Sequence, residues 1–142
     1  VGQGRTAGQA LINRFLTRLP SLDLLRKQVT EASAKGSLRG LDGRRLKIRS
    51  QHSALNTLIQ GAGAVVCKQW LVHIMERVIK EQLDIKLVAS IHDEYQFEVL
   101  NKDVDRFCVI TKEAIHATTK TLDLKCPLDN EYNIGTTWLE TH

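Results

Sequence analysis

Residues 50–82 constrain the fold of this chain most strongly. The stretch contains no proline, is rich in helix-forming residues, and is strongly apolar in its second half. A helix at the protein surface has one apolar face, but the apolar side chains of this stretch lie on more than one side. At least half of the stretch therefore belongs in the core. Because glycine weakens a helix interior, we expect Gly61 and Gly63 to divide the stretch into two helices. The apolar residues are Val65, Val66, Leu71, Val72, Ile74, Met75, Val78 and Ile79.

The other patterns of the chain predict an α+β fold. A small antiparallel sheet, part of it the hairpin around HDE, would pack against long helices. At 142 residues the chain can bury one core. We expect helices over residues 6–19, 21–36 and 103–120, a short hairpin over 38–48, and strands over 86–91 and 95–100.

The motif IHDEYQFEV places three ionisable side chains between two strand-like runs. Residues 87–91 predict a buried strand, and residues 95–99 alternate apolar and polar as in a half-buried strand. His92, Asp93 and Glu94 would then form a tight turn, although turns normally use Gly, Asn or Pro. The pattern fits a solvated hairpin tip, and it also fits a site in which two carboxylates and an imidazole are held rigidly.

Charge is distributed unevenly along the chain. Residues 1–49 hold 11 Lys and Arg against 3 Asp and Glu, a net of +8, whereas residues 50–142 hold 9 against 13, a net of −4. The basic residues concentrate in KGSLRGLDGRRLKIRS, around the turn dipeptide Asp42-Gly43. Such a block is either a solvated surface or a strip that binds nucleic-acid phosphates. Its basic members are Lys35, Arg39, Arg44, Arg45, Lys47 and Arg49.

Composition narrows the class of protein further. No apolar run approaches the roughly 18 residues of a membrane span, so we expect no membrane partner. Cys67, Cys108 and Cys126 lie far apart without CxxC spacing, which argues against a disulfide framework or a zinc site. Because the chain begins with Val1 rather than Met, we expect a fragment of a longer protein.

Three polar residues recur at helical spacing in SQHSALNTLIQGAGAVV. His52, Asn56 and Gln60 are separated by four residues each and would lie on one helix face. These side chains either satisfy neighbouring backbone groups or line a wet groove, or they reach a nucleic-acid duplex. Short amides suit the minor groove, where all base pairs present acceptors in nearly equivalent places.

Three motifs stand in order along the chain: GLDGRRLKIRS, HSALNTLIQGAGA and VASIHDEYQFEV. Together they resemble the C-terminal part of family A DNA polymerases, which include bacterial DNA polymerase I and the replicative polymerases of T-odd bacteriophages. RSQHSALNTLIQGAGAVVCKQW is similar to the phage version almost residue for residue. VGQGRTAGQALINRFL resembles the segment after the nucleotide-binding fingers helix, and WLETH resembles the C-terminal end. The resemblance implies a template-directed DNA polymerase in the cytoplasm of a bacterium or of a phage-infected host.

The resemblance also implies roles for individual residues. HDE corresponds to motif C of the palm, in which Asp93 and a motif A aspartate hold two Mg²⁺ ions for phosphoryl transfer. His92 would lie near the primer terminus, and Glu94 would be a supporting acid. Gln60 and Asn56 would contact the minor groove of the terminal base pairs.

The same resemblance implies a backbone-binding role for the basic block. At the position of His52, the phage members also have His, whereas bacterial members carry an Arg that contacts the primer terminus. The resemblance therefore does not decide whether His52 makes this contact. The residues expected to bind the duplex backbone are Arg39, Arg44, Arg45, Lys47 and Arg49.

Parts of the family pattern are missing from the chain. The motif A aspartate and the fingers helix that binds the incoming nucleotide would lie before Val1. We therefore expect residues 1–142 to be a single C-terminal polymerase fragment, with fingers-like helices in 1–36 and palm in 37–142. Alone it would be inactive, and the sheet edge left by the missing strand would favour self-association. Its partners would be primer-template DNA, deoxynucleoside triphosphates and the rest of the polymerase chain.

Two other hypotheses remain open at this point. The chain could be a non-catalytic module that binds duplex nucleic acid, which would need the basic strip and the amides but no acid at position 93. It could also be a metal-dependent nuclease built on the same turn. Against the nuclease, only Glu98 and Asp103 offer further acids near the turn in sequence, and the register places both far from it.

Overall fold

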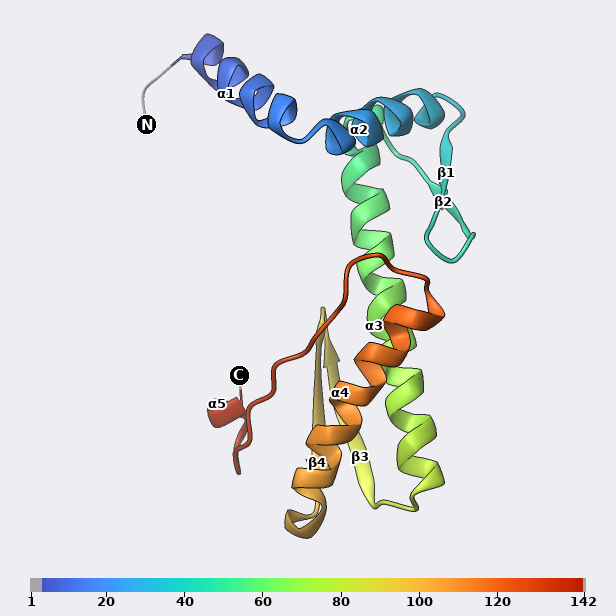
Figure 1. The fold of residues 1–142 in the computed structure, drawn as a ribbon, viewed down its shortest axis with the longest axis vertical. Coiled ribbons are helices and arrows are strands. Elements are labelled where there is room, and N and C mark those ends of the chain that lie inside the picture. The colour runs from blue at the N-terminus through green and yellow to red at the C-terminus, as the bar shows by residue number, and fades with distance from the viewer. Residues whose placement is uncertain (1–3, 142) are drawn as a thin grey trace. The chain divides into compact units, whose positions relative to one another are not determined.

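The computed structural model describes residues 4–141 and divides the chain into two compact units between Gly61 and Ala62 (Figure 1). Each unit has its own hydrophobic core. This division reflects packing. The boundary that we expected after residue 36 separates fingers-like and palm parts of a polymerase, and it stays a prediction. Among the described residues no helix is long and apolar enough to cross a membrane.

The first unit contains two helices and a small hairpin. Pro20 occupies the first turn of its second helix, where its missing N–H leaves no helical hydrogen bond unmade. The hairpin strands are antiparallel and only three residues long. The elements are α1 (Arg5–Arg18), α2 (Pro20–Ser33), β1 (Ser37–Arg39), β2 (Arg45–Lys47) and a 3-10 helix (Gln51–Ser53).

The core of the first unit is built from α2, the hairpin and the start of the next helix. Val29, Leu38 and Ala54 are buried, and Leu46 packs against them. Leu38 and Leu46 lie opposite each other in the strand register, so one face of the hairpin is apolar. Since side chains alternate along a strand, the neighbouring positions of β1 and β2 must face away from this core.

Helix α3 (Ala54–Lys80) is continuous, so the predicted break at Gly61 and Gly63 is wrong. A glycine in a helix interior costs about 1 kcal/mol relative to alanine but does not obstruct the helix. At Gly61 the absence of a side chain has a packing use, because an added Cβ would lie 3.2 Å from Leu46 Cδ1. Glycine here admits the hairpin rather than ending the helix.

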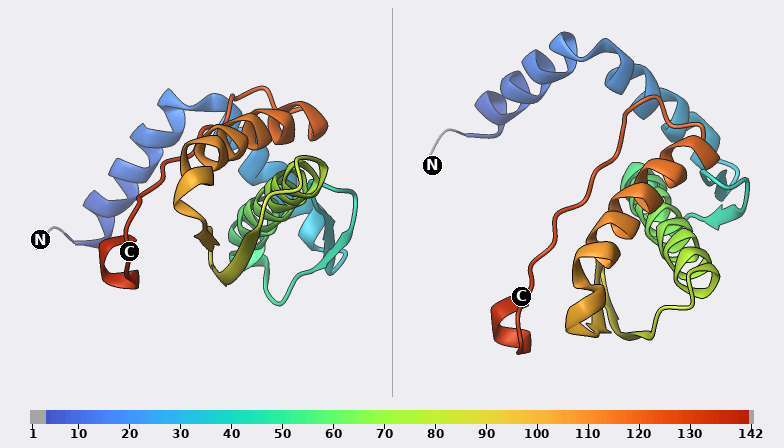
Figure 2. Two further views of the ribbon diagram at one scale, coloured as in Figure 1. Left: turned by 90° about the horizontal axis from the view of Figure 1, so that it is seen from below. Right: turned by 60° about the horizontal axis from the view of Figure 1, so that its bottom comes forward.

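The second unit joins most of α3 to a hairpin and a further helix. Its strands β3 (Ile85–Ile91) and β4 (Glu94–Val99) are antiparallel, and α4 (Val104–Thr121) packs beside α3. The chain then runs in an extended segment to the short helix α5 (Trp138–Thr141), as the two views of Figure 2 show. Long helices with two small antiparallel sheets confirm the predicted α+β class.

The core of the second unit lies between α3, α4 and one face of the hairpin. Ile74 and Ile110 are fully buried, and Phe97 and Val99 of β4 pack against the cluster. The alternation predicted for β4 is thus confirmed. The core cluster consists of Ile74, Val78, Ile85, Phe107, Ile110 and Ala114.

The expectation that residues 87–91 form a buried strand is wrong. Leu87 is 39% exposed and Val88 is 64% exposed, and only Ile85 of β3 belongs to the core. The register shifts between Leu87 and Ala89, which leaves Val88 without an opposite residue. In the described chain this sheet has two strands, and Leu87 and Val88 in the middle of β3 remain partly open to solvent.

Candidate active site and nucleic-acid interface

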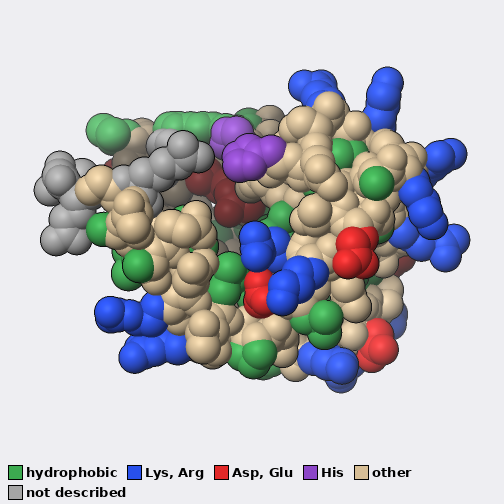
Figure 3. Space-filling view, turned by 90° about the horizontal axis from the view of Figure 1, so that it is seen from above, with side chains coloured by type: hydrophobic (Ala, Val, Ile, Leu, Met, Phe, Trp, Pro, Cys, Tyr) green, Lys and Arg blue, Asp and Glu red, His purple; other side chains and the backbone are tan. Residues whose placement is uncertain are grey.

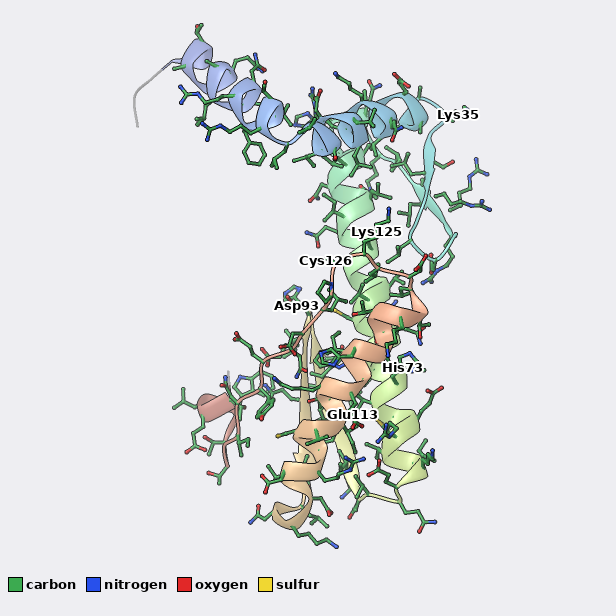
Figure 4. All side chains as sticks on the ribbon, viewed as in Figure 1. Lys35, His73, Asp93, Glu113, Lys125 and Cys126 are labelled. Carbon is green, nitrogen blue, oxygen red and sulfur yellow. The ribbon has the colours of Figure 1, made fainter. Side chains whose placement is uncertain are left out.

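His92 and Asp93 form the two-residue connection between β3 and β4. Ile91 pairs with Glu94 across the strands, so the turn is tight and Glu94 already belongs to β4. Asp93 lies at the end of the hairpin (Figure 4), and both turn residues are exposed. His92 has a φ of 54°, in the left-handed region that glycine normally occupies. Such strain is typical of functional turns.

An aromatic chain fixes the strand that follows the turn. Tyr95 lies 5.6 Å from Trp70 of α3 and 6.4 Å from Phe97, and Phe97 lies 4.8 Å from Phe107 of α4, all between ring centroids. Trp70 Nε1 also donates a hydrogen bond of 3.0 Å to the carbonyl of Thr111. The turn residues therefore project from a strand that is anchored to both long helices.

Asp93 also acts on the electrostatics of α3. The pKa of the Cys67 thiol is raised, first by burial and then by the charge of Asp93. A Cys67 thiolate is disfavoured, because the apolar surroundings and the nearby carboxylate both oppose a second negative charge. The side chain of Cys67 is thus a neutral neighbour of the turn.

Glu94 is held by residues that the sequence reasoning missed. Gln96 Nε2 donates to Glu94 Oε1, and Gln96 Oε1 accepts a hydrogen bond of 3.1 Å from Thr141 Oγ1 of α5. The contact between Glu94 and Gln96 could have been predicted, because residues two apart on a strand lie on the same face. The contact of Thr141 could not, since it depends on the path of the C-terminal segment.

The described residues contain no group of three His, Cys, Asp or Glu side chains that could hold a metal ion. Asp93 and Glu94 both line the cavity beside the turn, and carboxylate oxygens are the donors that Mg²⁺ prefers. Their chemistry fits a magnesium ion, but one further ligand at least would have to come from elsewhere. The assignment of Asp93 as a metal ligand therefore stays a prediction.

A cavity of about 350 Å³ lies beside the turn, along β4. It is lined by Asp93, Glu94 and residues of β4, α4 and the C-terminal segment. Asn130 lines it too, and its buried Oδ1 has no hydrogen-bond partner in the described structure. An unsatisfied buried carbonyl costs about 1–3 kcal/mol, so the cavity offers an acceptor to any group that enters.

The basic side chains of the first unit's hairpin share one face. Ser37 pairs with Lys47 and Arg39 pairs with Arg45, opposite to the face of Leu38 and Leu46. Lys and Arg side chains project outward on the surface seen in Figure 3. The register therefore confirms that a short hairpin presents these cations to solvent, without testing what they bind.

Arg44 differs from the other basic residues of the hairpin. It lies in the turn, where its Nε donates to Asp42 Oδ2 and its backbone N–H donates to Asp42 Oδ1. These bonds, the backbone one first, hold the pKa of the Asp42 carboxyl below its ordinary value. Lys47 and Arg49 are exposed and make no ion pair among the described residues.

The predicted polar stripe is only partly helical. His52 lies in the 3-10 helix before α3, so only Asn56 and Gln60 are related by a turn of α-helix. All three side chains are exposed. Within the described chain neither amide makes a side-chain hydrogen bond, which leaves both able to bind another molecule.

Comparisons with known proteins define the class of this fold. The polymerase domain of Pol1 from M. smegmatis, solved in complex with DNA primer-template and dNTP, superimposes with a TM-score of 0.75. The match covers 83% of this chain and 23% of that chain at 18% sequence identity. The chain thus has the fold of part of a polymerase domain.

The family follows from the sequence comparisons. The family model for DNA polymerase family A matches residues 1–140, so the chain belongs to that family. It is 35% identical to the DNA-directed DNA polymerase of Escherichia phage Phieco32 over all of this chain and 24% of that protein. The corresponding protein of Escherichia phage T7 is 30% identical, over all of this chain and 23% of that protein.

DNA polymerase I of Geobacillus stearothermophilus is 26% identical over 96% of this chain and 17% of that protein. The chain therefore spans about a quarter or less of the length of the curated relatives it matches.

Proposed function

We propose that this chain is the C-terminal part of a template-directed DNA polymerase that adds deoxynucleotides to a primer 3′-end. One observation carries the proposal. The chain belongs to DNA polymerase family A, and its Asp93 lies beside His92 in a tight turn between two strands that aromatic packing connects to α3 and α4. Phosphoryl transfer depends on positioning more than on covalent chemistry, so a rigid carboxylate is the part that the protein must supply.

Asp93 would hold Mg²⁺, and Glu94 would support it. Bound ions of this kind favour deprotonation of an attacking hydroxyl and stabilise the charge of a leaving pyrophosphate. His92, at the neighbouring position of the turn, would lie beside the primer terminus. Gln96 keeps the Glu94 carboxylate in place through its amide hydrogen bond.

The second carboxylate would come from a strand of the longer polymerase chain. We propose that this strand lies in the cavity along β4, where it would meet Asp93 at one end and the unpaired Asn130 carbonyl in the wall. A strand there would also cover an edge of the two-stranded sheet. Without it, the uncovered edge favours self-association of the chain, which would appear as concentration-dependent sedimentation.

The basic hairpin and the amides would bind the primer-template duplex. The exposed amides of Asn56 and Gln60 are free to contact acceptors in the minor groove, which vary little with sequence. His52 would approach the primer terminus from the 3-10 helix. The basic residues that would bind the phosphate backbone are Arg39, Arg44, Arg45, Lys47 and Arg49. In the longer polymerase, residues 1–36 would form fingers-like helices and residues 37–142 would belong to the palm.

Primer extension tests the proposal. The longer polymerase that contains this chain should extend a primer with deoxynucleoside triphosphates and Mg²⁺, whereas the 142-residue chain alone should bind the duplex without extending it. Extension by the chain alone would contradict the need for a second carboxylate. Duplex binding with no extension by the longer protein would favour the non-catalytic binding module instead.

A further inference from the structure

The side chains of β4 point alternately to the two faces of the hairpin. Tyr95 and Phe97 join the aromatic chain that packs on α3 and α4. Since side chains alternate along a strand, Glu94 and Gln96 share the opposite face. Both of them line the cavity beside the turn. Glu94 and Gln96 are therefore neighbours on the face of β4 that the hydrophobic core leaves open.

Gln96 uses both ends of its side-chain amide. Its Nε2 donates to Glu94 Oε1, and its Oε1 accepts a hydrogen bond of 3.1 Å from Thr141 Oγ1 of α5. An ionised carboxylate only accepts hydrogen bonds, so the nitrogen end of the amide must face Glu94 and the oxygen end must face Thr141. The Thr141 hydroxyl also lies 3.3 Å from the Trp138 carbonyl and 3.5 Å from the Thr137 carbonyl. Of the three contacts, the one to Gln96 is the shortest, and it joins α5 to β4.

The residues around the start of α5 fix the place of Thr141. Glu140 Oε2 accepts hydrogen bonds from the backbone N–H groups of Thr136 and Thr137. Threonine followed three residues later by glutamate is the capping-box pattern that begins a helix. Gly135 suits this turn, because an added Cβ would clash with the Cβ of Glu140. The sequence GTTWLE thus builds α5 locally, and α5 presents Thr141 to β4.

We propose that α5 positions the Glu94 carboxylate through Gln96, so that Thr141, Gln96 and Glu94 form a hydrogen-bond chain that orients the supporting acid of the metal site. This inference deepens the proposed function and rests on it. A carboxylate supports a metal ion only while its oxygens point toward the ion, and a neighbour that is itself hydrogen-bonded fixes that direction. Thr141 and Gln96 are positioning residues in this chain, since they act on Glu94 rather than on the reacting atoms.

The kinetics of the complete polymerase test this hydrogen-bond chain. Thr141→Val keeps the shape of the side chain but removes the hydroxyl, so kcat for primer extension should fall about fivefold, as for the loss of one hydrogen bond. The affinity for primer-template should stay unchanged, and the Mg²⁺ concentration that gives half the maximal rate should rise. Thr141→Ser keeps the hydroxyl and should behave like the unmodified polymerase. Thr17→Val is the matched control, because that hydroxyl donates to the Asn13 carbonyl within α1.

A double variant shows whether Thr141 acts through Gln96. Gln96→Met keeps the length of the side chain but removes both hydrogen bonds, so kcat should fall at least as much as in Thr141→Val. The double variant should lose no more than Gln96→Met alone, because Thr141 then has no amide to hold. Additive losses would overturn the inference, and so would an unchanged kcat and Mg²⁺ dependence in Thr141→Val.

NMR of the 142-residue chain separates this inference from the proposed function. If the longer protein extends no primer, the proposed function fails, but the contact between α5 and β4 can still be measured. The side-chain amide signals of Gln96, assigned by their loss in Gln96→Met, should shift in Thr141→Val and stay close to their places in Thr141→Ser and Thr17→Val. Signals that do not move in Thr141→Val would overturn the hydrogen-bond chain, whatever the longer protein does.

Discussion

His92 carries the backbone strain of the β3–β4 turn. For an L-residue the left-handed region costs about 1–2 kcal/mol, a penalty that glycine does not have. The chain keeps histidine there although a glycine would form the turn more easily. A strained residue next to Asp93 is therefore better explained by what the imidazole or the exact turn geometry does than by folding.

Replacing His92 separates the backbone strain from the imidazole. His92→Gly should raise the free energy of unfolding by about 1 kcal/mol relative to His92→Ala, because both lack the imidazole and only glycine relieves the strain. Urea unfolding of the two variants measures the difference. If the alanine variant is as stable as the glycine variant, the turn is not strained at this residue.

The exposed amide of Gln60 gives a second prediction at the scale of single residues. Gln60→Ala should weaken binding of primer-template by a similar factor for every sequence, since minor-groove acceptors are shared by all base pairs. Gln28→Ala, an exposed glutamine on α2, is the matched control. Anisotropy titrations on duplexes of different terminal pairs measure this. A loss confined to some sequences would argue against minor-groove contact.

At the scale of elements, α3 shows what the sequence could predict and what it could not. Its helical character follows from the spacing of its apolar residues. In the same way, the length of α4 follows from its own apolar spacing, and the two hairpins follow from alternation and from the Asp42-Gly43 turn. Its continuity through Gly61 and Gly63 did not follow, because the use of Gly61 depends on Leu46 of the hairpin. Likewise the exposure of Leu87 and Val88 depends on what packs against the faces of β3, which the sequence of the strand does not record.

In the candidate site, too, local features could be predicted and contacts between distant residues could not. The position of Asp93 in a turn could be predicted from the alternation of β4. The hydrogen bond from Thr141 to Gln96 could not, because it joins residues 45 apart in sequence.

Two glycines in α3 test this packing. Gly63→Ala should stabilise the chain by about 1 kcal/mol, because alanine favours helix and an added Cβ would meet nothing within 4 Å. Gly61→Ala should gain less, since its Cβ would lie 3.2 Å from Leu46. Thermal or urea unfolding measures both. An equal gain at the two positions would show that Leu46 does not crowd Gly61.

Helices α3 and α4 are also joined by ion pairs at Glu81. Arg106 donates to both carboxylate oxygens of Glu81, with Nε 2.6 Å from Oε2, and Arg77 donates to Oε1 at 3.0 Å. Hydrogen bonds from Arg106, followed by those from Arg77, lower the pKa of Glu81 from 4.5 to about 2. A lowered pKa means that the folded state favours the charged carboxylate.

The pH dependence of stability follows from this shift. The stabilisation by Glu81 is complete above its unfolded pKa near 4.5 and is lost as the pH falls toward about 2. Glu81→Gln should therefore reduce stability at neutral pH and flatten the acid limb of the unfolding curve. Glu31→Gln, the same substitution at an exposed acid on α2, is the matched control. A wild-type slope in Glu81→Gln would contradict the pKa shift.

For the whole molecule, the division of charge coincides with the division into units. Residues 50–61 contain no Asp, Glu, Lys or Arg, so the first unit carries the net +8 and the second the net −4. Backbone binding favours a basic surface, and metal binding favours an acidic one. Each unit thus has the charge that its proposed role in the polymerase requires.

The central claim is that Asp93 is a catalytic carboxylate, and primer extension by the complete polymerase tests it most directly. Asp93→Asn keeps the size of the side chain but removes its negative charge and replaces one acceptor oxygen with an NH2 donor. Extension should be abolished while the affinity for primer-template stays nearly unchanged, and Asp84→Asn, an exposed acid outside the turn, should extend normally. Extension by Asp93→Asn at a rate close to that of the unmodified polymerase would contradict the account.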